Sequence, residues 1–391
     1  MRLLPVLAIL GLLIWSGMSP AGAATPSDWP SLGANAAQSN FNADETALTT
    51  KNVRKLKVKW TVPIPDVSYP VVAGGHVYVP QQKGKSVHAE ALDVLTGKPV
   101  ATFTKGARGG LLVNGGKLYL AGHSLEILDA STGEKDAEIK GPSTSREATF
   151  TYPIADSRVV LAGYAGAGKK VANSIYAIDP TSDTVLWHSP SQNAQGAITA
   201  GRVLTLTSTG TVAYGESSGK TVTTEASLLS DWFGSGDLAF TVASAANHNA
   251  TLFAYDTSGH SAWSRKVGPR MDPRGWAHAA APQGVYVAML KPYEGLEALD
   301  PADGSVQWRA RLPGIQRLAA ANGMVFALSN EMGMPLRLAV YRADTGKVVA
   351  SLSLSAGYFA FSTSNELMIA EGMVFVRAVG PGGPTLVALA P

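Results

Sequence analysis

The stretch ALDPADGSVQW, Ala298 to Trp308, contains an aspartate, a glycine four residues later and a tryptophan four residues after the glycine. The same frame returns six more times, in LDVLTGKPVA (92–101), LDASTGEKDA (128–137), IDPTSDTVLW (178–187), YGESSGKTVT (214–223), YDTSGHSAW (255–263) and YRADTGKVVA (341–350). The copies lie about 41 residues apart on average, and a period of roughly 40 to 45 residues made of strands is typical of β-propeller blades. Helical repeats would need apolar faces with a 3.6-residue period, which this chain lacks.

Each copy of this turn motif stands in the same surroundings. Upstream lie two apolar stretches separated by a Gly or Asn turn, as in VVAGGHVYVP (71–80) and AAANGMVFALS (319–329), and this pattern predicts an inner hairpin. The aspartate and threonine of the motif can bond nearby backbone N–H groups, and its glycine tolerates a positive φ, so the motif itself predicts a second tight turn. We expect the motif tryptophans to fill the gaps between neighbouring blades, with each indole N–H bonded to a carbonyl oxygen. These are Trp60, Trp187, Trp263 and Trp308.

The two ends of the chain complete the count of blades. An eighth hairpin, LMIAEGMVFVRAVGPGGPTLVALAP (367–391), ends where its outer strand should follow, and an unpaired strand, LKVKWTVPI (56–64), precedes the first hairpin. Placing the second segment beside the first closes the ring and removes an exposed sheet edge. The sequence therefore predicts an all-β fold: a single eight-bladed β-propeller of four-stranded blades over residues 55–391, closed by an N-terminal strand in the C-terminal blade.

The composition fits one large all-β domain and argues against several other classes. Only 16% of residues are charged, and 41 glycines and 23 prolines supply turns for many short strands. A net charge of +3, with no run of five basic residues and no zinc-finger spacing, argues against a nucleic-acid partner. The seven histidines are scattered without metal-ligand spacing, so no metal site is expected.

The first residues predict export. MRLLPVLAILGLLIWSGMSPAGA (1–23) has one basic residue, an apolar core and a small-x-small end, as in a signal peptide, and residues 24–54 then form an N-terminal extension. The apolar run from Leu3 to Trp15 is too short to span a bilayer. The chain contains no cysteine, which excludes a disulfide and a lipid-modified cysteine. We expect a secreted or periplasmic monomer that is not a lipoprotein.

The segment DWPSLGANAAQSNFNADETALTTKNVRKLKVKW (28–60), followed by repeated LD..TG...W motifs, resembles the pyrroloquinoline-quinone-like (PQQ-like) β-propeller repeat proteins. The resemblance covers nearly all of the chain after the leader. This family includes quinoprotein alcohol and glucose dehydrogenases, the propeller lipoprotein of the bacterial outer-membrane barrel assembly machine and many exported proteins, so the resemblance implies the fold but not one function.

The chain departs from both named groups. Quinoprotein alcohol dehydrogenases carry adjacent cysteines over the quinone and longer insertions around it, and their fused electron acceptors carry a C-x-x-C-H haem site. The barrel-assembly propeller is a lipoprotein with a lipid-bearing cysteine. This chain lacks every cysteine of these features.

The loops that join one blade to the next are the expected functional region, because in propellers they surround one mouth of the central channel. In this chain they carry arginines and aromatic residues, a combination that suits a planar anionic ligand or an acidic peptide segment. The candidate ligand-binding residues are Arg108, Arg146, Arg274, Arg317, Trp232, Trp276, Tyr69, Tyr152 and Tyr358.

Two functions remain open at this point. The first is a binding or scaffold propeller for a protein or cell-envelope partner, with no cofactor, because the residues form no complete catalytic set. The second is a small PQQ-dependent dehydrogenase acting on an alcohol or sugar. The resemblance then implies PQQ with bound Ca²⁺, with Trp232 or Trp276 stacked on the quinone, Arg274 or Arg317 on its carboxylates and Asp272 as the base.

Overall fold

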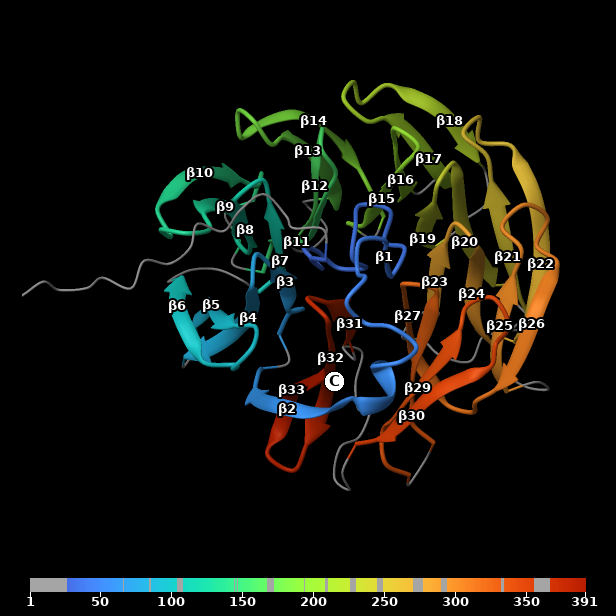
Figure 1. The fold of residues 1–391 in the computed structure, drawn as a ribbon. Coiled ribbons are helices and arrows are strands. Elements are labelled where there is room, and N and C mark those ends of the chain that lie inside the picture. The colour runs from blue at the N-terminus through green and yellow to red at the C-terminus, as the bar shows by residue number, and fades with distance from the viewer. Residues whose placement is uncertain are drawn as a thin grey trace, which may run out of the picture.

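The computed structural model describes residues 27–391 apart from positions 66, 84–85, 104–107, 144, 146, 167–171, 193, 208–209, 226–229, 245–248, 270–276, 290–293, 332–333 and 355–365. Within the described residues the regular elements are strands, with one short 3-10 helix, η1 (Val53–Lys55). The strands form eight sheets arranged as blades around a central axis (Figure 1). The predicted eight-bladed propeller is confirmed.

The first four blades follow one another along the chain, each with four antiparallel strands running outward from the axis. Their strands are β3 (Val71–Ala73), β4 (His76–Lys83), β5 (Ser86–Asp93) and β6 (Pro99–Phe103) in blade 1; β7 (Gly110–Asn114), β8 (Lys117–Ala121), β9 (Ser124–Asp129) and β10 (Lys135–Lys140) in blade 2; β11 (Thr149–Ala155), β12 (Val160–Ala165), β13 (Ser174–Asp179) and β14 (Thr184–Pro190) in blade 3; and β15 (Gly196–Thr199), β16 (Arg202–Thr207), β17 (Gly210–Gly215) and β18 (Thr221–Glu225) in blade 4.

The remaining blades repeat this order, and blade 7 gains a fifth, parallel strand, β1 (Phe41–Asn42), on its inner edge. Their strands are β19 (Ser230–Ser235), β20 (Leu238–Ser244), β21 (Asn249–Tyr255) and β22 (Ser261–Pro269) in blade 5; β23 (His278–Ala281), β24 (Gly284–Met289), β25 (Gly295–Leu299) and β26 (Val306–Arg311) in blade 6; β27 (Ile315–Ala321), β28 (Met324–Ser329), β29 (Arg337–Arg342) and β30 (Val348–Ser353) in blade 7; and β31 (Glu366–Ala370), β32 (Met373–Gly380) and β33 (Gly383–Ala390) in blade 8.

The outer strand of blade 8 comes from the other end of the chain. Strand β2 (Lys57–Pro63) pairs antiparallel with β33, with Trp60 opposite Ala388 (Figure 1). The predicted closure of the ring by an N-terminal strand is therefore confirmed. Because β2 occupies the position that the other outer strands fill in their own blades, β33 is left without an open edge.

The repeated turn motif joins each blade to its neighbour. Ala302 donates its N–H to the carboxylate of Asp300 over 2.8 Å, which is the predicted turn capping. The indole of Trp308 donates to the carbonyl oxygen of Ala343 over 2.8 Å and lies flat against Gly346, the motif glycine of the next blade. Gly346 has a φ of +65°, and a Cβ there would lie 2.5 Å from the indole, so two independent constraints select glycine.

The same docking recurs at three other blade contacts. Trp60, Trp187 and Trp263 donate to carbonyl oxygens of the following blade over 2.7 to 3.0 Å, and each lies against that blade's motif glycine. Trp60, Trp263 and Trp308 are each 9% exposed, whereas Trp187 is half-buried. At all four contacts the indole of one blade therefore lies against the turn of the next.

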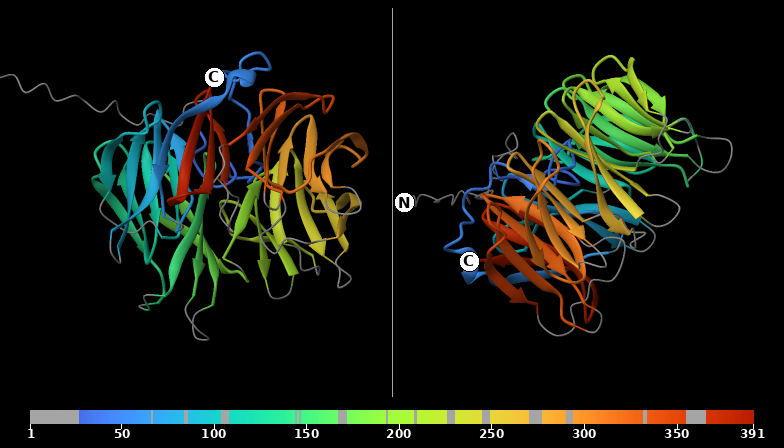
Figure 2. Two further views of the ribbon diagram at one scale, coloured as in Figure 1. Left: turned by 90° about the horizontal axis from the view of Figure 1, so that it is seen from below. Right: turned by 90° about the vertical axis from the view of Figure 1, so that its right-hand side faces the viewer.

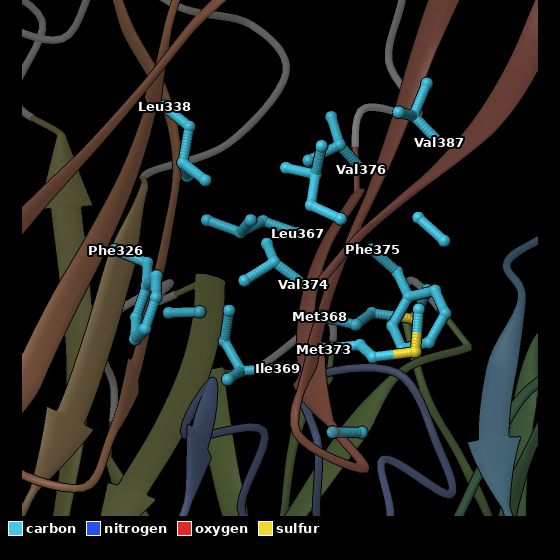
Figure 3. Packing of buried hydrophobic residues seen from close by; sticks show 14 of the residues in the cluster. Phe326, Leu338, Leu367, Met368, Ile369, Met373, Val374, Phe375, Val376 and Val387 are labelled. Atoms are coloured by element: carbon cyan, nitrogen blue, oxygen red, sulfur yellow. The ribbon is translucent and has the colours of Figure 1, made fainter. Parts of the chain in front are cut away.

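Apolar side chains from facing sheets fill the space between blades. Figure 3 shows this packing between blade 7, which contributes Phe326 and Leu338, and blade 8, which contributes Leu367, Val374 and Val376. All five side chains are at most 3% exposed. Burial of this kind is the main stabilising contribution to a fold without disulfides or described metal sites.

Residues 28–42, which we call the N-terminal plug, cross the centre of the ring (Figure 1). Six inner strands each donate one backbone N–H to a plug carbonyl, always from the residue two positions before the turn of the inner hairpin. The donor and acceptor pairs are Val72 with Trp29, Val113 with Pro30, Ile198 with Ala36, Gly234 with Ala37, Ala280 with Ser39 and Ala320 with Asn40, over 2.8 to 3.0 Å. The plug therefore pairs with blades 1, 2, 4, 5, 6 and 7 at one end of the channel.

Candidate functional site

The end of the channel opposite the plug is the expected mouth, because the inner strands begin there. Tyr69 lies just before β3, Tyr152 lies in β11 and Arg317 lies in β27. Tyr69 interacts electrostatically with both of the other side chains, so the structure brings these three predicted residues together from blades 1, 3 and 7. Tyr152 and Arg317 were expected in loops and are instead strand residues.

The two tyrosines form the aromatic part of this site. Their ring centroids lie 5.8 Å apart with the planes tilted by 42°, so the two rings are in contact. Tyr152 adopts a φ of +49°, next to a register shift in β11, while its N–H donates to the carbonyl oxygen of Gly109 over 2.8 Å. A left-handed conformation at a bulky residue is unfavourable and is often found at functional sites.

Two charged residues from blade 8 complete the group. Glu366 and Arg377 stand opposite each other in the register of β31 and β32, and they are 8% and 2% exposed. Arg377 donates to the carbonyl oxygens of Ser68 over 2.8 Å and Pro65 over 2.9 Å, which fixes the segment that carries Tyr69. We call Tyr69, Tyr152, Arg317, Glu366 and Arg377 the mouth cluster.

Burial determines the charge of the mouth cluster. It raises the pKa of Glu366 to about 7, although the guanidinium groups of Arg317 and Arg377 act in the opposite direction. Burial also raises the pKa of the Tyr69 hydroxyl, so this group stays neutral and able to donate a hydrogen bond. Two permanent positive charges therefore face one carboxyl group that is partly protonated near neutral pH, and the cluster carries a net positive charge suited to an anion.

The other predicted site residues are placed differently. Trp232 lies in β19 and packs against Tyr255, Leu204 and other residues of blades 4 and 5, beside a cavity of about 30 Å³. Arg108 is exposed just before β7. Arg146, Arg274, Trp276, Tyr358 and Asp272 lie outside the described residues.

Arg377 escaped the sequence analysis because it lies within a strand, and Glu366 because only the arginine and aromatic residues of the inter-blade loops were taken as candidates. A signal was available. Each is a charged residue in an otherwise apolar strand of the inner hairpin, in ELMIA (366–370) and MVFVRAVG (373–380), and such residues are rarely buried without a partner or a role.

A hollow with a volume of about 430 Å³ lies on the plug face, at the end of the channel opposite the mouth cluster. The plug forms its floor through residues such as Asn35 and Phe41, and hairpin turns of blades 3 to 6 form its walls. Most of the lining side chains are small, and Asp156 is the one charged lining residue among those described. The hollow therefore lacks the positive charge of the mouth cluster.

The described residues do not fit a calcium-bound quinone at the mouth. Calcium takes six to eight oxygen ligands, yet no group of three or more His, Asp or Glu able to hold a metal occurs in the described part of the chain. The carboxyl group of Glu366 interacts with two guanidinium groups, which would repel a divalent cation. Trp232, proposed to stack on the quinone, packs between blades.

Eight blades with repeated Asp- and Gly-containing turns, four of them docked by a tryptophan, around a plugged channel define a PQQ-like β-propeller. A family model described as outer membrane protein assembly factor BamB matches residues 171–319 and 294–390, together more than half of the chain. The chain belongs to this family. A comparison with curated proteins gives no match.

Solved structures of two functional kinds share the fold. A quinohemoprotein alcohol dehydrogenase from Comamonas testosteroni superposes with a TM-score of 0.65 at 16% identity, covering 94% of this chain and 81% of that chain. A europium-containing methanol dehydrogenase gives 0.64 at 14% identity, covering 94% and 98%. BamB from Moraxella catarrhalis gives 0.58 at 12% identity, covering 86% and 98%. At these identities the similarity establishes the fold alone.

Proposed function

We propose that this chain is an exported binding propeller whose mouth cluster holds an anionic segment of a protein or cell-envelope partner. The observation that carries the proposal is the net positive charge of the cluster beside two tyrosines whose rings are in contact. Charge-assisted hydrogen bonds from a guanidinium group to a carboxylate are stronger than neutral ones, and an aromatic ring adds contact area at low entropic cost.

The family membership supports a partner of this kind, since the matching model describes an assembly factor. Export rests on the leader-like sequence of residues 1–23, and we propose a periplasmic or secreted location on that basis. No described helix is long and apolar enough to cross a membrane.

The experiment compares two substitutions on the same blade. Arg317→Gln removes a charge from the mouth cluster, and Arg342→Gln removes one from the exposed turn of blade 7, where Arg342 pairs with Asp344. Wild type and both variants are used to capture partners from a cell-envelope extract, with each captured protein identified and its affinity measured at low and moderate salt. We expect a partner that binds wild type and Arg342→Gln but loses affinity for Arg317→Gln, most clearly at low salt.

A different outcome would favour the enzyme. The structural similarity to quinohemoprotein alcohol dehydrogenase makes PQQ with Ca²⁺ the necessary comparison ligand. PQQ serves in oxidation by accepting electrons from the substrate. If PQQ and Ca²⁺ together raise the melting temperature and support dye-linked oxidation of an alcohol, the binding-propeller proposal is wrong.

A further inference from the structure

A dense group of positive charges lies far from the mouth cluster, on the strand that closes the ring. Between Glu45 and Asp66 the chain has no acidic residue. Within the same interval Lys51, Arg54, Lys55, Lys57 and Lys59 follow one another closely, and all five side chains are exposed. We call these five residues the basic edge.

The local structure holds these cations on the surface. In and beside η1, Val53 and Leu56 turn inward and are 1% and 8% exposed, which leaves Arg54 and Lys55 outside. A register shift in β2 between Val58 and Trp60 then adds one residue to the strand, so three consecutive residues, 57 to 59, are exposed before Trp60 turns into the gap toward blade 1. Bulges commonly reorient side chains on edge strands in this way.

The positive charge of this surface is little compensated. None of the five side chains forms an ion pair with a carboxylate of the described residues, although the chain's terminal carboxylate lies close by, after Ala390, which pairs with Lys57. The adjoining turns add Lys98 of blade 1 and Lys347 of blade 7, both exposed. The neighbouring Asp344 is bonded to Arg342.

Exposed apolar side chains stand among these cations. Val58 is 43% exposed in β2, and Leu95 is 54% exposed next to Val94, whose carbonyl oxygen accepts the indole N–H of Trp60. Val348 is 58% exposed at the start of β30, the strand that η1 contacts. These three side chains lie on blades 8, 1 and 7, which are adjacent in the ring, so apolar contact area accompanies the positive charge there.

The basic edge lies on the rim of the plug face. Asn322, in the turn of blade 7 on that face, donates to the carbonyl oxygens of Thr46 and Leu48, which lead into η1. Figure 2 shows β2 and η1 at one margin of the ring rather than over its mouth. A flat surface that meets this rim would leave the mouth cluster free.

We propose that the basic edge binds the surface of a membrane containing anionic phospholipid. Lysines and arginines near such a surface each contribute attraction to the lipid phosphates, and the interleaved valine and leucine side chains enter the headgroup layer. A nucleic acid is a poorer match, since this surface offers no exposed aromatic side chain for stacking among its described residues. The proposal goes beyond the mouth cluster and does not depend on it.

The test measures binding to vesicles by co-sedimentation, using phosphatidylcholine alone and phosphatidylcholine with about 30% phosphatidylglycerol. We expect the full chain to bind only the anionic vesicles, and binding to weaken as the salt concentration rises. The triple substitution Lys55→Gln, Lys57→Gln and Lys59→Gln lowers the partition coefficient roughly 100-fold, at about fivefold for each lysine. Val58→Ser and Val348→Ser together weaken binding without changing its salt dependence.

A matched control separates a local site from net charge. Lys140→Gln, Lys220→Gln and Lys266→Gln remove three exposed lysines from blades 2, 4 and 5 and change the net charge equally. We expect this control to bind as wild type does, and both triple variants to keep the wild-type melting temperature, because exposed lysines contribute little to stability. The proposal is overturned if anionic vesicles do not bind wild type, if both triple variants lose binding equally, or if DNA or polyglutamate binds the basic edge while vesicles do not.

Discussion

The contact between Trp308 and Gly346 allows a test of how the blades are held together. Trp308→Ala removes an indole that is 9% exposed and deprives the carbonyl oxygen of Ala343 of its donor. Replacing a buried tryptophan by alanine costs about 3–5 kcal/mol of unfolding free energy through lost burial and a cavity. Gly346→Ala places a Cβ 2.5 Å from the indole at a φ of +65°. The left-handed backbone alone costs roughly 1–2 kcal/mol, and the steric overlap adds to this.

The double variant distinguishes the two contributions. When Trp308 is already alanine, the new Cβ at position 346 enters the vacated space, so only the backbone cost remains. We therefore expect the double variant to be more stable than the sum of the two single changes predicts, by the part of the Gly346→Ala cost that comes from overlap. Neighbouring residues that share a cavity typically show coupling of about 0.5–3 kcal/mol.

Urea unfolding followed by circular dichroism gives the free energies of unfolding of wild type, the two single variants and the double variant. Trp308→Ala combined with Gly97→Ala is the matched control, because Gly97 contacts Trp60 in another blade contact and the two changes should be additive. Additivity of Trp308→Ala with Gly346→Ala, or an unchanged melting temperature for Trp308→Ala, would refute the view that these tryptophans dock one blade on the next.

Three further predictions concern the ends of the chain and the mouth. Deleting residues 55–64 removes β2, opens the edge of β33 and should abolish cooperative unfolding, which a thermal melt would reveal. Asn42→Ala in the plug removes donors to the carbonyl oxygens of Ile369, Ser27 and Asp28 and should lower stability by about 1–3 kcal/mol in urea, whereas Asn330→Ala, at a single more exposed bond, should change it less. The folded-state pKa of Glu366 is raised above its unfolded value, so its contribution to stability is complete below about pH 4.5 and is lost as the pH rises through about 7. Across this range the free energy of unfolding should fall less steeply with rising pH for Glu366→Gln than for wild type. The slope that remains in the variant should include a contribution from Glu216, whose pKa burial also raises to about 7.

The fold was predictable because its strongest signal repeats. A motif such as ALDPADGSVQW would be ambiguous alone, but seven copies with one surrounding pattern fix the blade, and the unpaired segment around Trp60 fixes the closure. The plug was not predicted, because it is held through its backbone carbonyl groups, which any residue type can supply, and because residues 28–42 contain no repeat.

The mouth cluster was predicted only in part. Tyr69, Tyr152 and Arg317 were found because aromatic and basic residues near blade boundaries are conspicuous, although two of them proved to be strand residues. Glu366 and Arg377 each stand out as a charged residue in an apolar strand, but nothing local indicates that these opposite positions in a hairpin will face residues from three other blades. The basic edge escaped because Asn, Val and Leu interrupt its charges, so it contains no continuous basic run.

The pairing of β2 with β33 also determines when the ring can close during folding. A chain that emerges from its amino end presents the plug and the closing strand first, yet their partners in blade 8 are synthesised last. Contacts between the two ends of a chain form slowly, because the entropy of closing the intervening loop must be overcome before the contact stabilises it. Until then, β33 has an open outer edge, and a chain that stops short of β33 leaves β2 without a partner. The ring therefore closes only after β33 has been made and β2 has paired with it.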